Sequence, residues 1–292
     1  MKKQSGFRRL VALALTLCML AALTSEIFAA DIVASGYCGG EGDGKNLTWT
    51  LDSDGVLTIS GLGKMKDYHS NNAPWQENGT AIKSIVFSSG ITNIGNYSFY
   101  CCTAESFTLS LPDSIESIGK RAFFKTALEG ELEFPQQLKS IETSAFELCK
   151  KITEIRFSGN QLTSIGDYAF ADCTGLKQLQ IPNSVLQIGE YAFAGCMNLS
   201  GDLIIPDSVA TIKSYAFQNC TGLDGTLTLG TGLKYIESAA FRGCSFTGEL
   251  IIPQTITGID NFAFVGCKFS GVLSIPDSVT RIGRYAFLDV MR

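Results

Sequence analysis

Apolar and polar positions follow the same order in one segment of this chain after another. The segment 176–196, LKQLQIPNSVLQIGEYAFAGC, contains one copy of that order. Residues 178–181 alternate polar and apolar, which is the two-residue period of a β-strand. Pro182 should end the strand because it has no amide hydrogen to donate. The apolar residues that follow are spaced for a loose turn or a short helical piece: Val185, Ile188, Ala192 and Phe193.

The pattern recurs at a nearly constant period, which is easiest to measure on its phenylalanine. Successive copies lie 24, 23, 24, 23, 24, 24, 23 and 23 residues apart, and an isoleucine precedes each phenylalanine by five positions. A fixed period of about 20–29 residues is typical of a solenoid, in which each unit buries its apolar face only against its neighbours. We therefore expect nine stacked units, about 4.8 Å apart. Their phenylalanines are Phe99, Phe123, Phe146, Phe170, Phe193, Phe217, Phe241, Phe264 and Phe287.

The units resemble the BspA-like class of leucine-rich repeats, whose consensus runs close to L-x-x-L-x-I-P-x-S-V-x-x-I-G-x-x-A-F-x-x-C. Clear copies are IPNSVLQIGEYAF, IPDSVATIKSYAF and IPDSVTRIGRYAF, which begin at Ile181, Ile205 and Ile275. The resemblance covers about residues 81–292. It implies a solenoid of α/β type that is mostly β, a right-handed superhelix of about nine repeats of 23–24 residues.

The segment before the repeats predicts a small cap. Residues 47–50 and 56–59 alternate around Asp54-Gly55, which is typical of a β-hairpin. With Trp49 and Trp75 it is expected to cover the first repeat, as the end of a solenoid requires. The segment also resembles the amino-terminal cap found ahead of BspA-like arrays. We therefore expect a cap at 31–80 and repeats at 81–292.

Residues 1–30 have the layout of a secretory signal peptide. Four basic residues come first, an apolar run follows at 10–23, and small residues stand at Ala29 and Ala30. The run is shorter than the about 20 residues of a membrane span. An uncleaved anchor and lipidation at Cys18 are the alternatives, the second disfavoured by the bulky Leu17. The mature chain is expected to be secreted or at the cell surface, with no membrane insertion.

Charge restricts the partners. Without residues 1–30, 19 basic and 27 acidic residues remain, and no basic run is left. Nucleic acid is therefore excluded as a partner.

Nine cysteines remain in the mature chain, and most occupy one repeat position, three residues after the phenylalanine. Thr126 and Val290 fill that position in two other copies, which indicates a small buried site. Stacked units place neighbouring Cβ atoms about 4.8 Å apart, whereas a disulfide prefers about 3.8 Å. We therefore expect free thiols, although a bridge between Cys38 and Cys101 in the cap region stays open. The cysteines of this ladder are Cys102, Cys149, Cys173, Cys196, Cys220, Cys244 and Cys267.

The sequence predicts no catalytic, cofactor or metal site. Its single histidine, His69, lies in a loop, and the thiols lack the paired C-x-x-C spacing of zinc sites. Glu131, Glu133 and Glu154 gather on adjacent strands, but Arg156 beside them indicates a solvated face of mixed charge.

Strand residues that point away from the core form two rows along the stack. Such rows make a long shallow surface suited to a protein or glycan partner. Ile204, Ile251 and Val272 are apolar at positions expected to be exposed. The candidate contact residues are Arg156, Gln178, Gln180, Asp202, Ile204, Thr226, Thr228, Glu249, Ile251 and Val272.

Two functions fit this surface. The first is an extracellular binding and adhesion module on a concave solenoid face, with no enzymatic activity. The family resemblance implies partners such as host matrix proteins, other cell-surface proteins or glycans. The alternative is a structural or spacer array in a cell-envelope assembly that self-associates through its open carboxy-terminal repeat.

Overall fold

The computed structural model describes residues 30–70 and 72–290. The predicted signal peptide falls almost entirely on residues 1–29, which lie outside the described residues. The description below concerns the compact unit that starts at Ile32.

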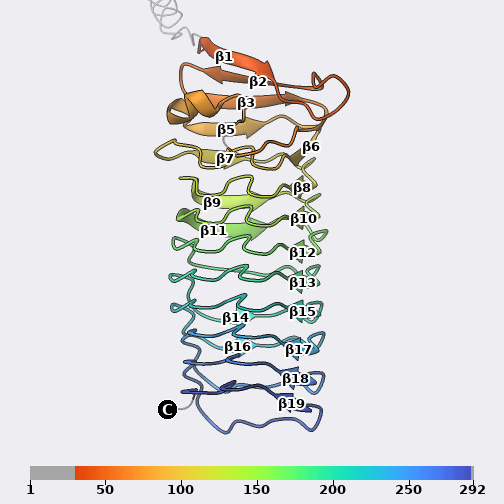
Figure 1. Cartoon of the computed structure of the whole chain (residues 1–292), viewed down its shortest axis with the longest axis vertical. Coiled ribbons are helices and arrows are strands. Elements are labelled where there is room, and N and C mark those ends of the chain that lie inside the picture. The colour runs from red at the N-terminus through yellow and green to blue at the C-terminus, as the bar shows by residue number, and fades with distance from the viewer. Residues whose placement is uncertain (1–29, 71, 291–292) are drawn as a thin grey trace, which may run out of the picture. The chain divides into compact units, whose positions relative to one another are not determined.

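This unit is built almost entirely from short β-strands (Figure 1). Its only helical element in the described ranges is the 3-10 helix η1 (Gln76–Ala81), so the α part of the expected fold is absent there. The strands are β1 (Ile32–Tyr37), β2 (Leu47–Asp52), β3 (Val56–Gly61), β4 (Gly63–Lys64), β5 (Ser84–Phe87), β6 (Ile91–Ile94), β7 (Thr108–Ser110), β8 (Ser117–Ile118), β9 (Glu129–Phe134), β10 (Ser140–Ile141), β11 (Lys151–Phe157), β12 (Ser164–Ile165), β13 (Gln187–Ile188), β14 (Leu203–Ile204), β15 (Thr211–Ile212), β16 (Leu227–Thr228), β17 (Tyr235–Ile236), β18 (Gly258–Ile259) and β19 (Arg281–Ile282).

Each turn of the solenoid contributes to two parallel ladders. The first contains the strands predicted for the repeats, namely β5, β7 and the pairs β9-β11 and β14-β16, and the antiparallel cap strands β1, β2 and β3 join it at β5. Isolated bridges continue it, Glu154–Gln178 beyond β11 and Ile251–Ser274 beyond β16. The second ladder is one ten-stranded sheet in the order β19-β18-β17-β15-β13-β12-β10-β8-β6-β4.

The second ladder corrects one expectation from the sequence. The isoleucine five positions before the phenylalanine was assigned to a loose turn, yet Ile165 pairs with Ile141 on one side and with Ile188 on the other. A two-residue strand shows no alternation in its own sequence, because its hydrogen bonds come from neighbouring turns. At residues 178–181, where the sequence predicts a strand, the structure has only one isolated β-bridge, formed by Gln178.

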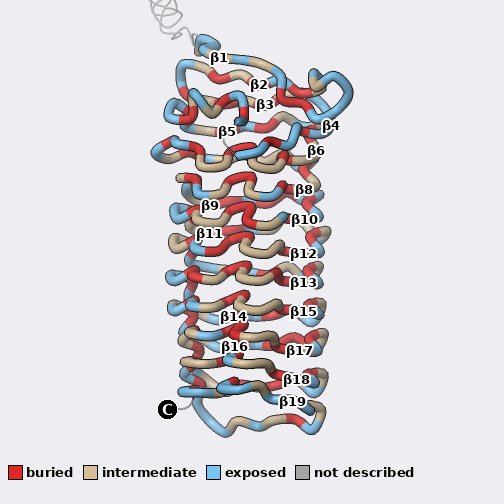
Figure 2. The backbone as a smooth tube through the Cα atoms, in the orientation of Figure 1, coloured by how far each residue is buried: buried red, intermediate tan, exposed pale blue. Residues whose placement is uncertain are grey.

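The core is a column of phenylalanine rings. All nine repeat phenylalanines stack on their neighbours, with ring centroids 5.0 to 5.6 Å apart and planes within 15° of parallel. Phe99 to Phe264 are fully buried. Buried residues recur in every turn of the tube in Figure 2. The period in the sequence is thus the period of one continuous core.

The predicted hairpin is confirmed and joins the stack directly. β2 and β3 pair antiparallel, and β3 then pairs parallel with β5 of the first repeat. The Trp75 ring is fully buried and stacks on Phe99 with centroids 5.2 Å apart, while Trp49 meets it edge-on at 5.9 Å. The Trp75 indole N–H donates to the Ser98 carbonyl at 2.9 Å. The aromatic column therefore continues into the cap.

Two positions in every repeat have left-handed backbone, two residues before and two residues after the phenylalanine. Tyr191 (φ 54°) and Asn219 (φ 59°) are examples of the two. Glycine, asparagine and aspartate tolerate this region, whereas other residues are strained there by about 1–2 kcal/mol. At the second position, three repeats have Cys101, Lys125 or Leu148 instead of a tolerant residue.

Replacing Lys125 with asparagine is therefore expected to stabilise the fold by about 0.5–1 kcal/mol. Lys125 is exposed and has φ 54°, so the change relieves backbone strain without removing buried contacts. Urea unfolding followed by circular dichroism measures the gain. Lys234→Asn, at an exposed position without left-handed backbone, is the matched control and should not stabilise. Equal effects of both variants would contradict the explanation from strain.

Candidate functional site

All ten candidate contact residues are exposed in the structure. They lie on the outer side of the first ladder, where register sets Ile204 opposite Thr228, Arg156 opposite Glu133 and Ile251 opposite Ser274. We call this surface the outer face. The core side chains of the same strands, such as Leu203 and Leu227, are buried beneath it.

A groove hollows the outer face next to the end of β11. Its volume is about 890 Å³. Four of the candidates line it, namely Arg156, Gln178, Gln180 and Asp202. A second hollow of about 460 Å³ lies on the other side of Arg156 and shares Glu133, Arg156 and Ser158 with the first. The remaining six candidates extend along the face toward the carboxy-terminal repeats.

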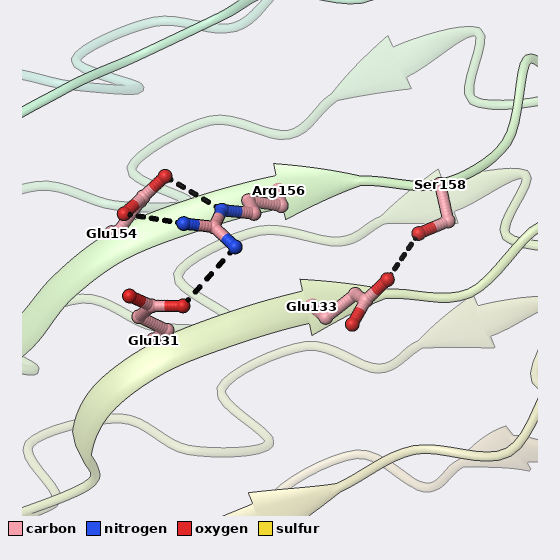
Figure 3. A network of polar contacts seen from close by, with 5 residues as sticks. All are labelled: Glu131, Glu133, Glu154, Arg156 and Ser158. Atoms are coloured by element: carbon pink, nitrogen blue, oxygen red, sulfur yellow. Dashed lines mark hydrogen bonds and ion pairs between the residues drawn. The ribbon is translucent and has the colours of Figure 1, made fainter.

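Residues that line the two hollows form a network of hydrogen bonds and ion pairs (Figure 3). The Arg156 guanidinium forms two hydrogen bonds to Glu154, at 2.7 and 3.1 Å, and an ion pair with Glu131 at 3.3 Å. The Ser158 hydroxyl donates to Glu133 at 2.6 Å. Glu131 and Glu154 are direct neighbours across β9 and β11, so without Arg156 two like charges would face each other.

The same contacts shift the ionisation of these groups. Hydrogen bonding from Arg156 lowers the pKa of Glu154, and Glu154 and Glu131 in turn raise the pKa of Arg156. Farther along, the backbone N–H and hydroxyl of Thr226 donate to Asp202 and lower the pKa of its carboxyl group. The carboxyl groups of Glu154 and Asp202 are therefore charged at neutral pH.

The sequence analysis missed the irregular loop that borders the groove. Ser158, Gly159 and Asn160 line the hollow. Between the last strand residue and the next buried aliphatic residue, Phe157 to Leu162, the step is five positions, whereas in the other eight repeats it is four. Gly159 packs so closely on the backbone of Gln136 that a Cβ there would overlap it. Insertions in repeat proteins often fall on the binding face, and comparing loop lengths could have found this one.

The part of the face beyond the groove bears three exposed aliphatic residues among the polar side chains of Thr226, Thr228 and Glu249. The exposed fractions of Ile204, Ile251 and Val272 are 63%, 69% and 81%. Single exposed aliphatic residues are common, but these three share one face of one ladder.

The ladder cysteines lie on the inside and not on this face. All seven are buried, and the nine cysteines of the described ranges, Cys38 and Cys101 included, are free. From the second ladder cysteine onward, each thiol donates to the carbonyl of a phenylalanine in the preceding repeat, as in Cys196 to Phe170 at 3.2 Å and Cys220 to Phe193 at 3.1 Å. Burial raises the pKa of Cys149 to about 11 and that of Cys267 to about 12. The thiols of Cys149 and Cys267 therefore stay protonated at neutral pH and donate to turn carbonyls.

The described residues contain no group of three or more His, Cys, Asp or Glu side chains that could hold a metal ion. His69 is exposed in its loop. Within the described ranges no helix has the length and hydropathy needed to cross a membrane.

Comparison with known proteins gives a consistent result. The family model for the BspA type leucine rich repeat region matches in six copies at residues 77–200 and 199–291. A leucine-rich repeat protein from Bacteroides ovatus is similar in structure, with 21% identity, 82% of this chain and 66% of that chain covered, and a TM-score of 0.51. No curated protein matches the sequence.

Two further solved structures are more distant in shape. The leucine-rich repeat protein of T. pallidum is 24% identical, with 70% of this chain and 89% of that chain covered and a TM-score of 0.46. A leucine-rich cell surface protein from Faecalibacterium prausnitzii is 21% identical, with 86% and 92% covered and a TM-score of 0.36.

Proposed function

The chain belongs to the BspA-type leucine-rich repeat proteins, and on this premise we propose that it is a secreted or cell-surface adhesion module that binds a macromolecular partner on its outer face. Binding, and not catalysis, is the function that the surface favours. The outer face offers a long row of exposed side chains, and Arg156, Glu133 and Asp202 there are engaged in surface hydrogen bonds.

One observation carries the proposal most directly. Ile204, Ile251 and Val272 remain exposed on a face whose neighbouring positions are polar. Aliphatic side chains at such positions contribute nothing to the core, because the alternate residues of the same strands fill it. They can gain binding energy only when a partner covers them.

Replacing Ile204 and Ile251 together with serine is expected to weaken partner capture at least about ten-fold, because each loses about 1–1.5 kcal/mol of burial in the complex. The mature chain, immobilised, would be exposed to extracellular matrix and cell-surface extracts, and bound material quantified. Leu186→Ser is the matched control, since Leu186 is 51% exposed and is not a member of either outward row. If the double variant captures as much material as the unchanged chain and its circular dichroism spectrum is unchanged, the outer face is not the binding surface.

A further inference from the structure

The outer face divides into two chemically different halves. The groove half bears the carboxylates of Asp113, Glu131, Glu133, Glu154 and Asp202 and the single guanidinium of Arg156 among the residues that line the two hollows. The other half bears the three exposed aliphatic side chains, with Thr226, Thr228 and the one carboxylate of Glu249 between them. A partner that covers both halves has to match both chemistries.

The positive charge in the groove is already compensated. The Arg156 guanidinium forms ion pairs with Glu154 and Glu131, so its charge is neutralised and attracts an incoming anion only weakly. Glu133 is bonded only to the neutral Ser158 hydroxyl, and Asp202 only to Thr226; the described residues give neither of them an ion-pair partner. Asp113 adds a further exposed carboxylate at the edge of the second hollow. The groove therefore has uncompensated negative charge on an open surface.

We propose that the partner is an extended protein segment with lysine or arginine side chains that enter the groove and aliphatic side chains that cover Ile204, Ile251 and Val272. This inference rests on the proposed function, because it names the partner class for the same face. A polyanion such as a sulfated glycan is repelled by the carboxylates. A neutral glycan hydrogen-bonds to amides and carboxylates, but the C–H groups of its rings bury less apolar area on the second half than aliphatic side chains do.

The dimensions suit such a segment. From the Arg156 position to the Ser274 position the first ladder advances five repeats, about 24 Å at the spacing of parallel strands. An extended chain covers that length with about seven residues. A peptide of about twelve residues is therefore long enough to reach both halves at once.

The test uses defined probes on the mature chain. Two synthetic twelve-residue peptides carry lysine at alternate positions in one half and valine in the other, in both orders, with serine between. Probes of the excluded classes are the same peptides with glutamate in place of lysine, heparin and dextran. Affinity is measured by fluorescence anisotropy at low and at physiological salt. The chain variants are Glu133→Gln with Asp202→Asn, and Ile204→Ser with Ile251→Ser; the controls are Asp54→Asn, in the cap hairpin turn, and Leu186→Ser.

The expected result is binding of a lysine–valine peptide, weakened about ten-fold by either double variant and by less than about two-fold by the controls. The loss in the charge variant should shrink as salt rises. Stronger binding of the glutamate peptide, heparin or dextran would overturn the inference. So would binding that the charge variant leaves unchanged.

The same variants separate the two proposals. If no lysine–valine peptide binds, yet Ile204→Ser with Ile251→Ser still lowers capture from extracts, the inference on partner class is wrong and the outer face stays the binding surface. If capture from extracts is also unaffected, the proposed function itself fails.

Discussion

Replacing Phe193 with alanine is expected to lower the free energy of unfolding by about 3–5 kcal/mol, because it opens a cavity in the middle of the aromatic column. The Phe193 ring is fully buried and stacks on Phe170 at 5.4 Å and on Phe217 at 5.3 Å. Urea unfolding monitored by circular dichroism measures the loss. Leu186→Ala, at an exposed position seven residues before Phe193 in the same turn, should change stability by less than about 0.5 kcal/mol.

The position of the column also predicts how this variant unfolds. Stability in a solenoid is approximately a sum over repeats and the interfaces between them, so a weak repeat divides the stack. Hydrogen exchange should therefore quicken first at the turns around Phe193 and later in the cap. A loss below about 1 kcal/mol, or exchange that quickens uniformly over the described turns, would contradict a column built from neighbour contacts alone.

Alkaline pH is expected to destabilise the folded chain. The ionisation of its buried thiols sets how steeply the free energy of unfolding falls with pH. Burial raises the pKa of Cys149 to about 11 and that of Cys267 to about 12, and holds those of Cys173, Cys196 and Cys220 well above the ordinary value. In the unfolded chain these thiols ionise near pH 8.5. Between about pH 8.5 and 11 the unfolded state thus binds fewer protons than the folded state, and the free energy of unfolding falls as pH rises.

The size of this effect is large. Each buried thiol lowers the free energy of unfolding by up to about 1.4 kcal/mol per pH unit over the range in which it is ionised in the unfolded chain and protonated in the folded one, and the contributions of several thiols add. Urea midpoints measured from pH 7 to 10.5 give the slope, and the ultraviolet absorbance of thiolate should appear together with unfolding. Cys173→Val is the matched variant, because valine occupies this repeat position at Val290, and it should reduce the slope by one thiol. Thiolate absorbance in a chain that remains folded would contradict the buried ladder.

The repeat period could be predicted from the sequence, but the ten-stranded second ladder could not. The phenylalanine column, the cap hairpin and the inward cysteines all follow from side chains that recur at one spacing, and the contacts among them are between equivalent positions. The strands that pair Ile165 with Ile188 have two residues each, so their sequences are too short to show an alternation of polar and apolar residues. Local sequence cannot show hydrogen bonds that only neighbouring turns provide.

For the candidate site, alternation identified which residues point outward, and the structure has them all exposed. What alternation could not show was where the face is hollowed. The groove depends on the extra residue between Phe157 and Leu162 and on how Arg156 folds onto Glu131 and Glu154. A side-chain network of that kind is set by three-dimensional distances, although the inserted residue is visible in the sequence.

Photo-crosslinking tests the central claim, that the outer face is the binding surface, most directly. A benzophenone-bearing residue would replace Ile204 on the outer face in one variant and Leu186, outside both outward rows, in another; both positions are exposed. Irradiation in the presence of extracellular matrix and cell-surface extract should link partner material to the variant labelled at 204 and leave the variant labelled at 186 largely unlinked. Equal crosslinking at the two positions, or crosslinking at 186 alone, would contradict it.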